Sequence, residues 1–206
     1  MHTLFWLQPP RAATKNQTTR LHAIRMPLQA VSTAQALQTT ITIETATNAA
    51  LEEVRVNMAE MKAENKPVEL VTSVGSCVAI CIHDSTNKCG GLAHIMLPDS
   101  AIAPHEPLPA KFADTAVPAL MRAIRRVGGN DAKLTAKIAG GANMFPTMNA
   151  LNIGSKNIDA VKTALDKHKI RLLGEEVGGS SGRRITFNIA TGAATVKRFN
   201  GAVIKI

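Results

Sequence analysis

The sequence has few aromatic residues, few cysteines and no long apolar run. Only 3% of its 206 residues are aromatic and none is tyrosine, so a core must be built from aliphatic side chains. Three cysteines are too few for the disulfide framework of a small secreted protein, which favours reduced thiols and a cytoplasmic setting. No apolar stretch approaches the ~20 residues that a membrane-spanning helix needs, so we predict no membrane insertion.

Acidic residues are missing from the first 43 positions. This stretch carries four basic residues, Arg11, Lys15, Arg20 and Arg25. It is rich in Thr, Ala and Gln and shows weak periodicity. Such a composition resembles an organelle transit peptide, a flexible tail, or sequence upstream of a later start such as Met58. We expect residues 1–53 to form a basic, disordered extension and residues 54–206 to form one folded domain.

The net charge of +9 raises the question of a polyanionic partner. Nucleic-acid surfaces combine basic residues with aromatic side chains, and no such pattern occurs here. One basic cluster, at Arg122, Arg125 and Arg126, falls on a predicted helix and is explained by a solvated helix face. We therefore predict that the protein binds no nucleic acid.

Hydrophobic periodicity predicts more strands than helices. Amphipathic helices are expected over residues 113–127 and 155–168. Thr115 is expected to cap the first of them, which would place Pro118 in the first turn, where proline is tolerated. Strands are expected over residues 70–74, 77–83, 91–97, 134–139, 170–173, 184–189, 194–199 and 202–206.

Cys77 stands out because it follows Gly75 and Ser76 at the mouth of a predicted strand. A glycine at such a position lets the backbone approach a ligand closely. Backbone N–H groups at the same turn are suited to hold an oxyanion. A cysteine with these surroundings is a candidate nucleophile, since a thiolate is the reactive form and a neighbouring imidazolium lowers the pKa of a thiol.

His94 is the candidate base for this thiol. If the intervening turn is a two-residue loop at Ser85 and Thr86, Cys77 and His94 face each other across a hairpin, with Cβ atoms ~5 Å apart. A slip of one residue in the register would break this pairing. A third group usually orients the base, and Thr72 on the preceding strand is close enough in sequence to serve.

Two other interpretations of these residues stay open. A lone cysteine in a strand is most often a structural thiol. Zinc binding is the second alternative, because the segment holds five potential ligands, Cys77, Cys81, His83, Cys89 and His94. Cys-x₃-Cys within one strand is poor zinc geometry, however, so we rank a metal site below catalysis and take Cys81 and Cys89 as a core thiol and a hairpin residue.

Several sequence blocks together resemble the signature of the CheD family of chemoreceptor glutamine deamidases. They occur in that family's order and spacing and cover about residues 54–206. The blocks are Gly75–Ala79, Asp84, Gly90–Pro98, Lys137–Phe145, Asn152–Gly154 with Asn157, Val177–Gly179, and Gly182–Arg183.

The resemblance implies an α/β (α+β) fold, a layered sandwich of mixed β-sheets flanked by helices. It implies that Cys77 is the nucleophile, His94 the base and Thr72 the third catalytic residue, with Ser73 as the fallback. The implied reaction converts glutamines of methyl-accepting chemotaxis receptors to glutamates and requires no metal or organic cofactor.

The resemblance also implies a partner, the CheC-type phosphatase of chemotaxis. Phe145 matches a family position at that contact, although core packing explains a phenylalanine there equally well. Two alternatives to the deamidase therefore remain: a weakly catalytic or non-catalytic regulator that binds CheC, and a structural zinc protein. Hydrolysis of receptor methyl esters would use the same thiol chemistry.

Overall fold

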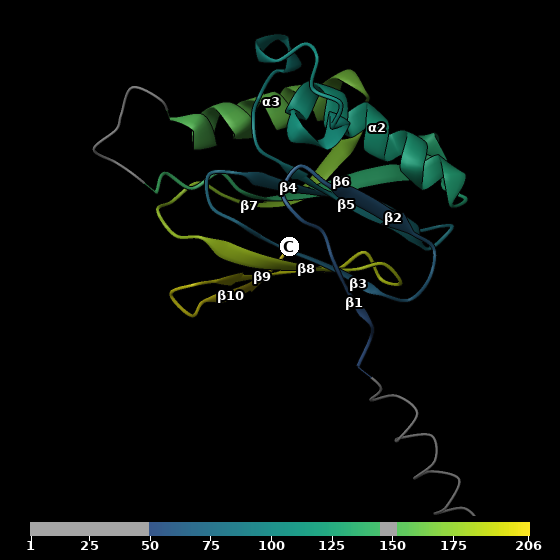
Figure 1. Cartoon of the computed structure of the whole chain (residues 1–206). Helices are drawn as coiled ribbons and strands as arrows, with labels where there is room; N and C mark the ends of the chain where they lie inside the picture. The colour runs from purple at the N-terminus through teal and green to yellow at the C-terminus, as the bar shows by residue number, and fades with distance from the viewer. Residues whose placement is uncertain (1–49, 145–151) are drawn as a thin grey trace, which may run out of the picture. The chain divides into compact units, whose positions relative to one another are not determined.

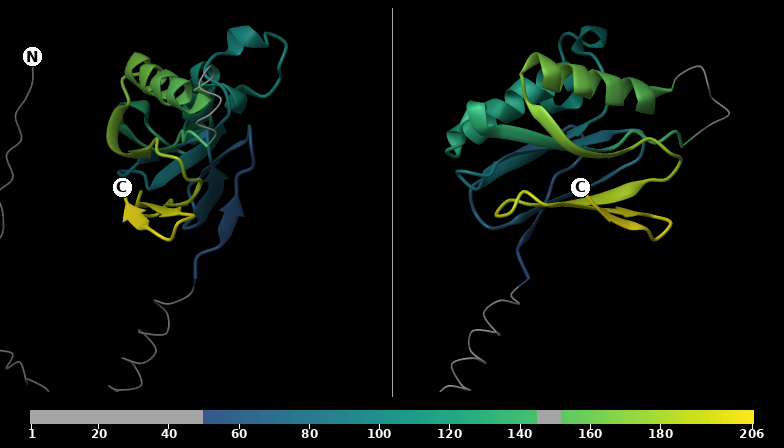
Figure 2. Two further views of the ribbon diagram at one scale, coloured as in Figure 1. Left: turned by 90° about the vertical axis from the view of Figure 1, so that its left-hand side faces the viewer. Right: turned by 180° about the vertical axis from the view of Figure 1, so that it is seen from behind.

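The computed structural model describes residues 50–144 and 152–206. Two five-stranded sheets pack face to face, and two helices cover the outer face of one sheet (Figure 1). Figure 2 shows the same three layers from the side and from behind. The predicted layered α+β sandwich of mixed sheets is therefore confirmed.

The first sheet has the strand order β1-β3-β8-β9-β10 and the second the order β2-β5-β4-β6-β7. Two pairs are parallel, β1 with β3 and β6 with β7, and the others are antiparallel. The elements are β1 (Glu53–Arg55), β2 (Met61–Glu64), β3 (Glu69–Val74), β4 (Val78–Asp84), β5 (Cys89–Ile95), α2 (Ala113–Arg126), β6 (Leu134–Gly140), α3 (Ile153–Lys167), β7 (Arg171–Val177), β8 (Arg183–Asn188), β9 (Ala194–Arg198) and β10 (Val203–Lys205).

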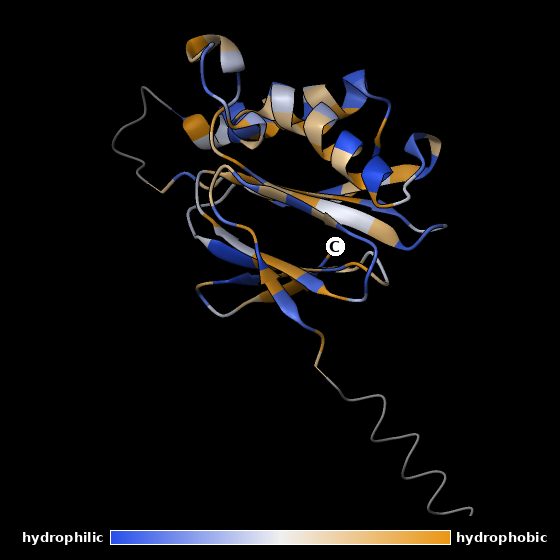
Figure 3. Cartoon of the chain, turned by 45° about the vertical axis from the view of Figure 1, so that its right-hand side comes forward, coloured by the Kyte–Doolittle hydropathy of each residue, from blue (hydrophilic) through white to orange (hydrophobic). Residues whose placement is uncertain are grey.

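Two apolar cores hold these layers together. Side chains of β4 alternate between them: Val78 and Ile80 face the helices, whereas Ala79 and Cys81 face the first sheet. Every residue of β4 and β5 is buried, because a sheet covered on both faces leaves no solvent-exposed side. Buried residues of α2 and α3 belong to the core on this sheet, and hydrophilic and hydrophobic segments alternate along the two helices in Figure 3. None of the helices in the described residues is long and apolar enough to cross a membrane.

Both predicted helices and all eight predicted strands are present, with ends displaced by a few residues. The prediction missed β1 and β2, which have three and four residues and lie at the margins of their sheets. Neither short, partly exposed strand carries an apolar alternation long enough to recognise. A chain that began at Met58 would lack β1 altogether.

The prediction for the start of α2 was wrong. The helix begins at Ala113 with Phe112 at the capping position, and no side chain caps it. The Thr115 hydroxyl instead donates a hydrogen bond backwards to the Pro109 carbonyl, over 2.7 Å. Pro118 consequently lies in the second turn, where its missing N–H leaves the carbonyl four residues earlier without that partner.

The hairpin between β4 and β5 also differs from the prediction. Asp84 pairs with Cys89, so the loop contains four residues rather than two, and Lys88 adopts a left-handed φ of 50°. The buried Asp84 carboxylate holds this loop through hydrogen bonds from the backbone N–H groups of Thr86 and Asn87 and from the Asn87 amide. It also accepts from the backbone of Asn130. The longer loop shifts the register, so His94 faces Ala79 and not Cys77.

We expect Asp84→Asn to destabilise the fold by about 1–3 kcal/mol, because an amide would place donors against the donors that now bind the carboxylate. Burial alone would raise the pKa of Asp84. The hydrogen bonds from Asn130, Asn87 and Thr86 outweigh this effect and lower the pKa below its ordinary 3.8. The advantage of the wild type should thus be complete above pH 3.8 and shrink as the pH falls below that value. Urea unfolding at several pH values measures the difference.

The control for this prediction is Asp131→Asn, the same substitution at an exposed ion pair with Arg125. It should change the free energy of unfolding by no more than about 0.5 kcal/mol. Equal losses in the two variants at neutral pH would contradict the role assigned to Asp84.

Candidate functional site

Cys77 lies on the bend that joins β3 to β4, immediately before β4 begins. Its side chain is partly buried and packs against the core between the two sheets. The bend is held by two backbone hydrogen bonds from the segment after β6: the Gly141 N–H donates to the Cys77 carbonyl over 2.7 Å, and the Ala142 N–H donates to the Gly75 carbonyl over 2.8 Å. Cys77 is therefore partly accessible, while the backbone around it is fixed.

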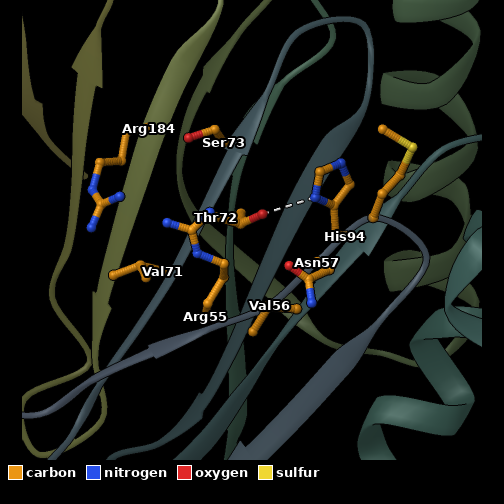
Figure 4. A pocket seen from close by; sticks show the side chains of 9 residues that line it. Arg55, Val56, Asn57, Val71, Thr72, Ser73, His94 and Arg184 are labelled. Atoms are coloured by element: carbon orange, nitrogen blue, oxygen red, sulfur yellow. Dashed lines mark hydrogen bonds between the residues drawn. The ribbon is translucent and has the colours of Figure 1, made fainter.

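His94 lies on β5 and is only 3% exposed. Its Nδ1 forms a hydrogen bond of 2.8 Å with the hydroxyl of Thr72, which reaches across from β3 in the other sheet (Figure 4). Its Nε2 is buried and has no hydrogen-bond partner among the described residues. If Nδ1–H donates to Thr72, Nε2 carries the free lone pair that a base requires. The fallback residue Ser73 is exposed and makes no hydrogen bond with His94.

Cys77 and His94 are diagonal neighbours rather than directly opposed. His94 pairs with Ala79, and Cys77 precedes Ala79 by two residues, which keeps its side chain on the same face. Diagonal neighbours in antiparallel strands lie ~7–8 Å apart at Cα, within reach of long side chains. The predicted direct pairing was thus wrong, yet both side chains face the space between the two sheets.

Burial governs the protonation of both groups. Desolvation raises the pKa of the Cys77 thiol above its ordinary 9.0, with its own backbone N–H opposing the change. Desolvation lowers the pKa of His94 below its ordinary 6.5. Near neutral pH the free protein therefore holds a neutral thiol and a neutral imidazole. The imidazole is in the form that accepts a proton, so this arrangement suits general-base activation of the thiol.

The bend also offers donors for an oxyanion. The backbone N–H groups of Ser76 and Cys77 donate to no backbone carbonyl within the described part of the chain. Amides at this position lie next to the carbon that a Cys77 thiolate would attack. They are the candidates for stabilising a tetrahedral intermediate.

Asn157 lies at the site, although the sequence alone gave no reason to assign a role to its side chain. It lies on α3, is fully buried, and its amide donates to the carbonyls of Ser76 (3.0 Å) and Met96 (2.9 Å). One side chain thus joins the residue before Cys77 to the residue two positions after His94. Its Oδ1 is buried and has no partner among the described residues. The sequence feature that could have identified Asn157 is its place as a polar residue on the apolar face of a predicted helix.

A second brace supports the segment that holds the Cys77 bend. The Gly178 N–H donates to the Gly140 carbonyl over 2.8 Å, and the Asn143 N–H donates to the Gly179 carbonyl over 2.7 Å. Gly140 has a φ of 122°, and a Cβ there would overlap the Cys77 carbonyl oxygen, so glycine is required for this approach.

Arg183 fixes the loop that carries Gly178 and Gly179. Only 1% exposed, its guanidinium donates to the Glu176 carboxylate and to the carbonyls of Glu176, Gly178 and Ser181. Arg198 binds the other oxygen of Glu176. This buried cluster sets the position of the loop that supports the Cys77 bend.

The remaining thiols and His83 lie in separate environments. Cys81 faces the core between the sheets, where burial raises its pKa to about 12, whereas Cys89 faces the helices. The Nε2 of His83 is 2.8 Å from the Ile189 carbonyl. The five residues considered for zinc are thus spread over two faces, and the described residues contain no group of three or more metal-ligating side chains. Phe145 lies outside the described residues.

Comparisons with known proteins identify the family. Residues 96–198 match the family model described as CheD, "CheD chemotactic sensory transduction". A protein of Desulforamulus reducens named "Probable chemoreceptor glutamine deamidase CheD" is 44% identical over 158 residues, which cover 75% of this chain and 95% of that protein. A Thermotoga maritima protein named "Chemoreceptor glutamine deamidase CheD" is 41% identical over 147 residues, which cover 71% and 92%.

A solved structure of a Neisseria meningitidis protein, described as family-model DUF152, aligns with 8% identity over 72% of each chain at a TM-score of 0.40, too low to support any argument.

The sequence relatives identify the family and cover the candidate site. A continuous stretch covering 75% of a 206-residue chain contains residues 77 to 94 wherever it begins, so the Desulforamulus similarity includes the candidate site. With this identity over nearly the whole length of its relatives, the chain belongs to the CheD family.

Proposed function

We propose that this protein hydrolyses the side-chain amides of glutamines on methyl-accepting chemotaxis receptors, which leaves glutamate and releases ammonia. One observation carries the proposal: a buried imidazole whose Nδ1 is held by Thr72 and whose Nε2 is unpartnered lies on the same face as the Cys77 thiol. Relatives named chemoreceptor glutamine deamidase support the choice of substrate.

The first half of the reaction forms a thioester. His94 Nε2 accepts the thiol proton, and the Cys77 sulfur attacks the amide carbon of the bound glutamine. The carbonyl oxygen becomes an oxyanion, held by the backbone N–H groups of Ser76 and Cys77. The C–N bond then breaks as the His94 imidazolium gives its proton to the departing nitrogen, which leaves as ammonia.

The second half uses water. Neutral His94 takes a proton from a water molecule, whose oxygen attacks the thioester carbon and forms a second oxyanion at the same position. The C–S bond breaks, the proton returns from His94 to the sulfur, and the glutamate side chain is released. Each cycle consumes one water and one amide and regenerates the thiol and the neutral imidazole.

The product explains how such a reaction would tune signalling. Each converted glutamine becomes a negatively charged glutamate on the receptor. Like charges on neighbouring helical positions repel, so the balance between two receptor states shifts with the number of conversions.

The wider setting follows from the same proposal. The folded domain, which includes β1 from Glu53 onwards, acts in the cytoplasm, and a CheC-type phosphatase is a partner. Phe145 is the candidate contact for CheC. A regulator without hydrolysis remains the competing function, but the Thr72–His94 hydrogen bond and the position of Cys77 on the same face of the second sheet as His94 favour an enzyme.

The direct test is incubation of the purified chain with a receptor cytoplasmic fragment. Ammonia release is followed, and peptide mass mapping detects glutamine-to-glutamate conversion. Cys77→Ala should abolish both signals, because the other two cysteines, Cys81 and Cys89, are buried. His94→Gln should lower kcat by roughly 10²–10⁴, the contribution of a general base.

Cys89→Ala is the matched control, since it removes a thiol from the helix-facing core and leaves the bend of Cys77 intact. It should retain activity if circular dichroism shows that it folds. Wild-type protein that converts no glutamine on a panel of receptor fragments, yet binds CheC, would replace the enzyme by the regulator.

We expect Thr72→Val to lower kcat by roughly 10- to 100-fold, less than the loss of the base itself. Valine keeps the shape of threonine but cannot hold the Nδ1 of His94, so the imidazole loses its fixed tautomer and orientation. Thr72→Ser keeps the hydroxyl and should recover most of the rate. Steady-state ammonia release measures both, and equal rates for Val and Ser would show that the hydroxyl plays no part.

The pH dependence should show that the thiol rests in its neutral form. Because burial raises the pKa of Cys77 above 9.0, alkylation by iodoacetamide should accelerate with rising pH through a midpoint above 9. Because burial lowers the pKa of His94, the acid limb of kcat/KM should have its midpoint below 6.5. Mass spectrometry of the Cys77 peptide, with Cys77→Ala as blank, follows the first quantity. Rapid alkylation that is constant from pH 5 to 9 would instead show a thiolate–imidazolium pair at rest.

A further inference from the structure

A pocket of about 180 Å³ opens beside the buried pair of Thr72 and His94 (Figure 4). Cys77 does not line it, so it is a separate depression that reaches the imidazole from the side of β1 and β3. Two arginines, Arg55 at the end of β1 and Arg184 on β8, lie on its walls together with Ser73 and Asn57.

The pocket forms because β1 ends before β3 does. β1 pairs with β3 only as far as Val71, and the Val71 carbonyl accepts the last bond, from the Val56 N–H over 2.9 Å. Backbone groups of a strand point alternately to its two sides, so those of Ser73 point the same way as those of Val71. The chain has already left the sheet at this point, and the Ser73 N–H therefore faces the pocket without a strand to bind.

The pocket carries more free positive than negative charge. Arg55 is exposed and forms no ion pair with any residue in the described ranges. Arg184 is 2.7 Å from the carboxylate of Glu53, but both side chains are solvent-accessible, so this ion pair contributes little free energy. The nearby Glu60 carboxylate is bound to the backbone and side chain of Asn57. The pocket thus presents donors and an unpaired positive charge.

We propose that this pocket binds the carboxylate of an acidic residue near the target glutamine, and that Arg55 is a specificity-determining residue for acidic substrates. This inference rests on the proposed function and deepens it. A guanidinium binds a planar carboxylate through two parallel hydrogen bonds, and the Ser73 hydroxyl and N–H supply further donors. Since each turnover itself creates a glutamate, conversion of one glutamine makes its neighbourhood a better substrate.

The experiment compares two receptor fragments, one native and one with the acidic residues flanking the target glutamine replaced by alanine. Arg55→Gln should raise KM for the native fragment by roughly 2- to 5-fold, with a much smaller effect on kcat, because an exposed charge pair contributes modestly to binding. It should change KM for the neutralised fragment by less than twofold, since the interaction partner is already absent.

Two further variants test the expected direction of the change in KM and control for the loss of a positive charge. Glu53→Gln releases Arg184 from its ion pair and should lower KM for the native fragment. Arg126→Gln removes the same charge from an exposed position on α2 and should leave both KM values unchanged. Equal effects of Arg55→Gln and Arg126→Gln, or equal effects of Arg55→Gln on the two fragments, would overturn the proposal.

A binding measurement separates this proposal from the proposed function. Fluorescence anisotropy of labelled fragments with Cys77→Ser protein reports affinity without turnover. If the wild type releases no ammonia but Arg55→Gln weakens binding of the native fragment alone, the deamidase fails and the acid-binding pocket stands. If turnover is normal and anisotropy does not distinguish the two fragments, the pocket fails and the deamidase stands.

Discussion

The hydrogen bond between Thr72 and His94 is the constraint on which the site depends. The two residues belong to different sheets, and their neighbours in the intervening core are apolar side chains such as Leu70 and Leu92. An unpaired polar atom in such surroundings is costly, so the bond fixes the orientation of the imidazole strongly. It exists only while the sheets keep their spacing of ~10 Å. The packing of the sandwich therefore determines which nitrogen is left free to accept a proton.

The position of Cys77 depends on the other layers of the fold. Cys77 belongs to no strand, and its position is set by bonds from Gly141 and by the amide of Asn157 on α3. The first of these contacts rests on the loop that the buried Arg183 holds in place. A buried ion pair contributes little net stability, because desolvation offsets the attraction between the charges. The role of Arg183 is then to define a loop conformation, and through it the distance from the thiol to the imidazole.

The sequence allowed the helices and the longer strands to be predicted, because their apolar patterns have the periods of 3.6 and 2 residues. The short strands β1 and β2 were missed, since their positions depend on pairing with partners and not on their own composition. The hairpin register was wrong because the loop contains four residues, the last of which, Lys88, adopts a left-handed conformation that few non-glycine residues take.

Part of the candidate site could also be predicted from the periodicity of the sequence. Alternation along β4 correctly places Cys77 and His94 on one face even when the register is wrong, because the error moved each partner by an even number of positions. The approach of Thr72 to Nδ1 is a contact between two sheets, which no local pattern reports. The opening beside Arg55 is likewise invisible in sequence, because it arises where one strand ends beside a longer one.

The neutral resting state of the thiol and imidazole has a consequence for control of the reaction. A thiolate is the form that oxidants and disulfides attack, so a neutral, half-buried thiol is protected when no substrate is bound. Proton transfer to His94 creates two charges in a poorly solvated space, and substrate must lower that cost. A carboxylate bound beside Arg55 would add negative charge near the imidazole and favour its protonated form. Recognition of an acidic neighbour and activation of Cys77 would then be one event, with the reactive thiolate appearing only when the correct substrate is in place.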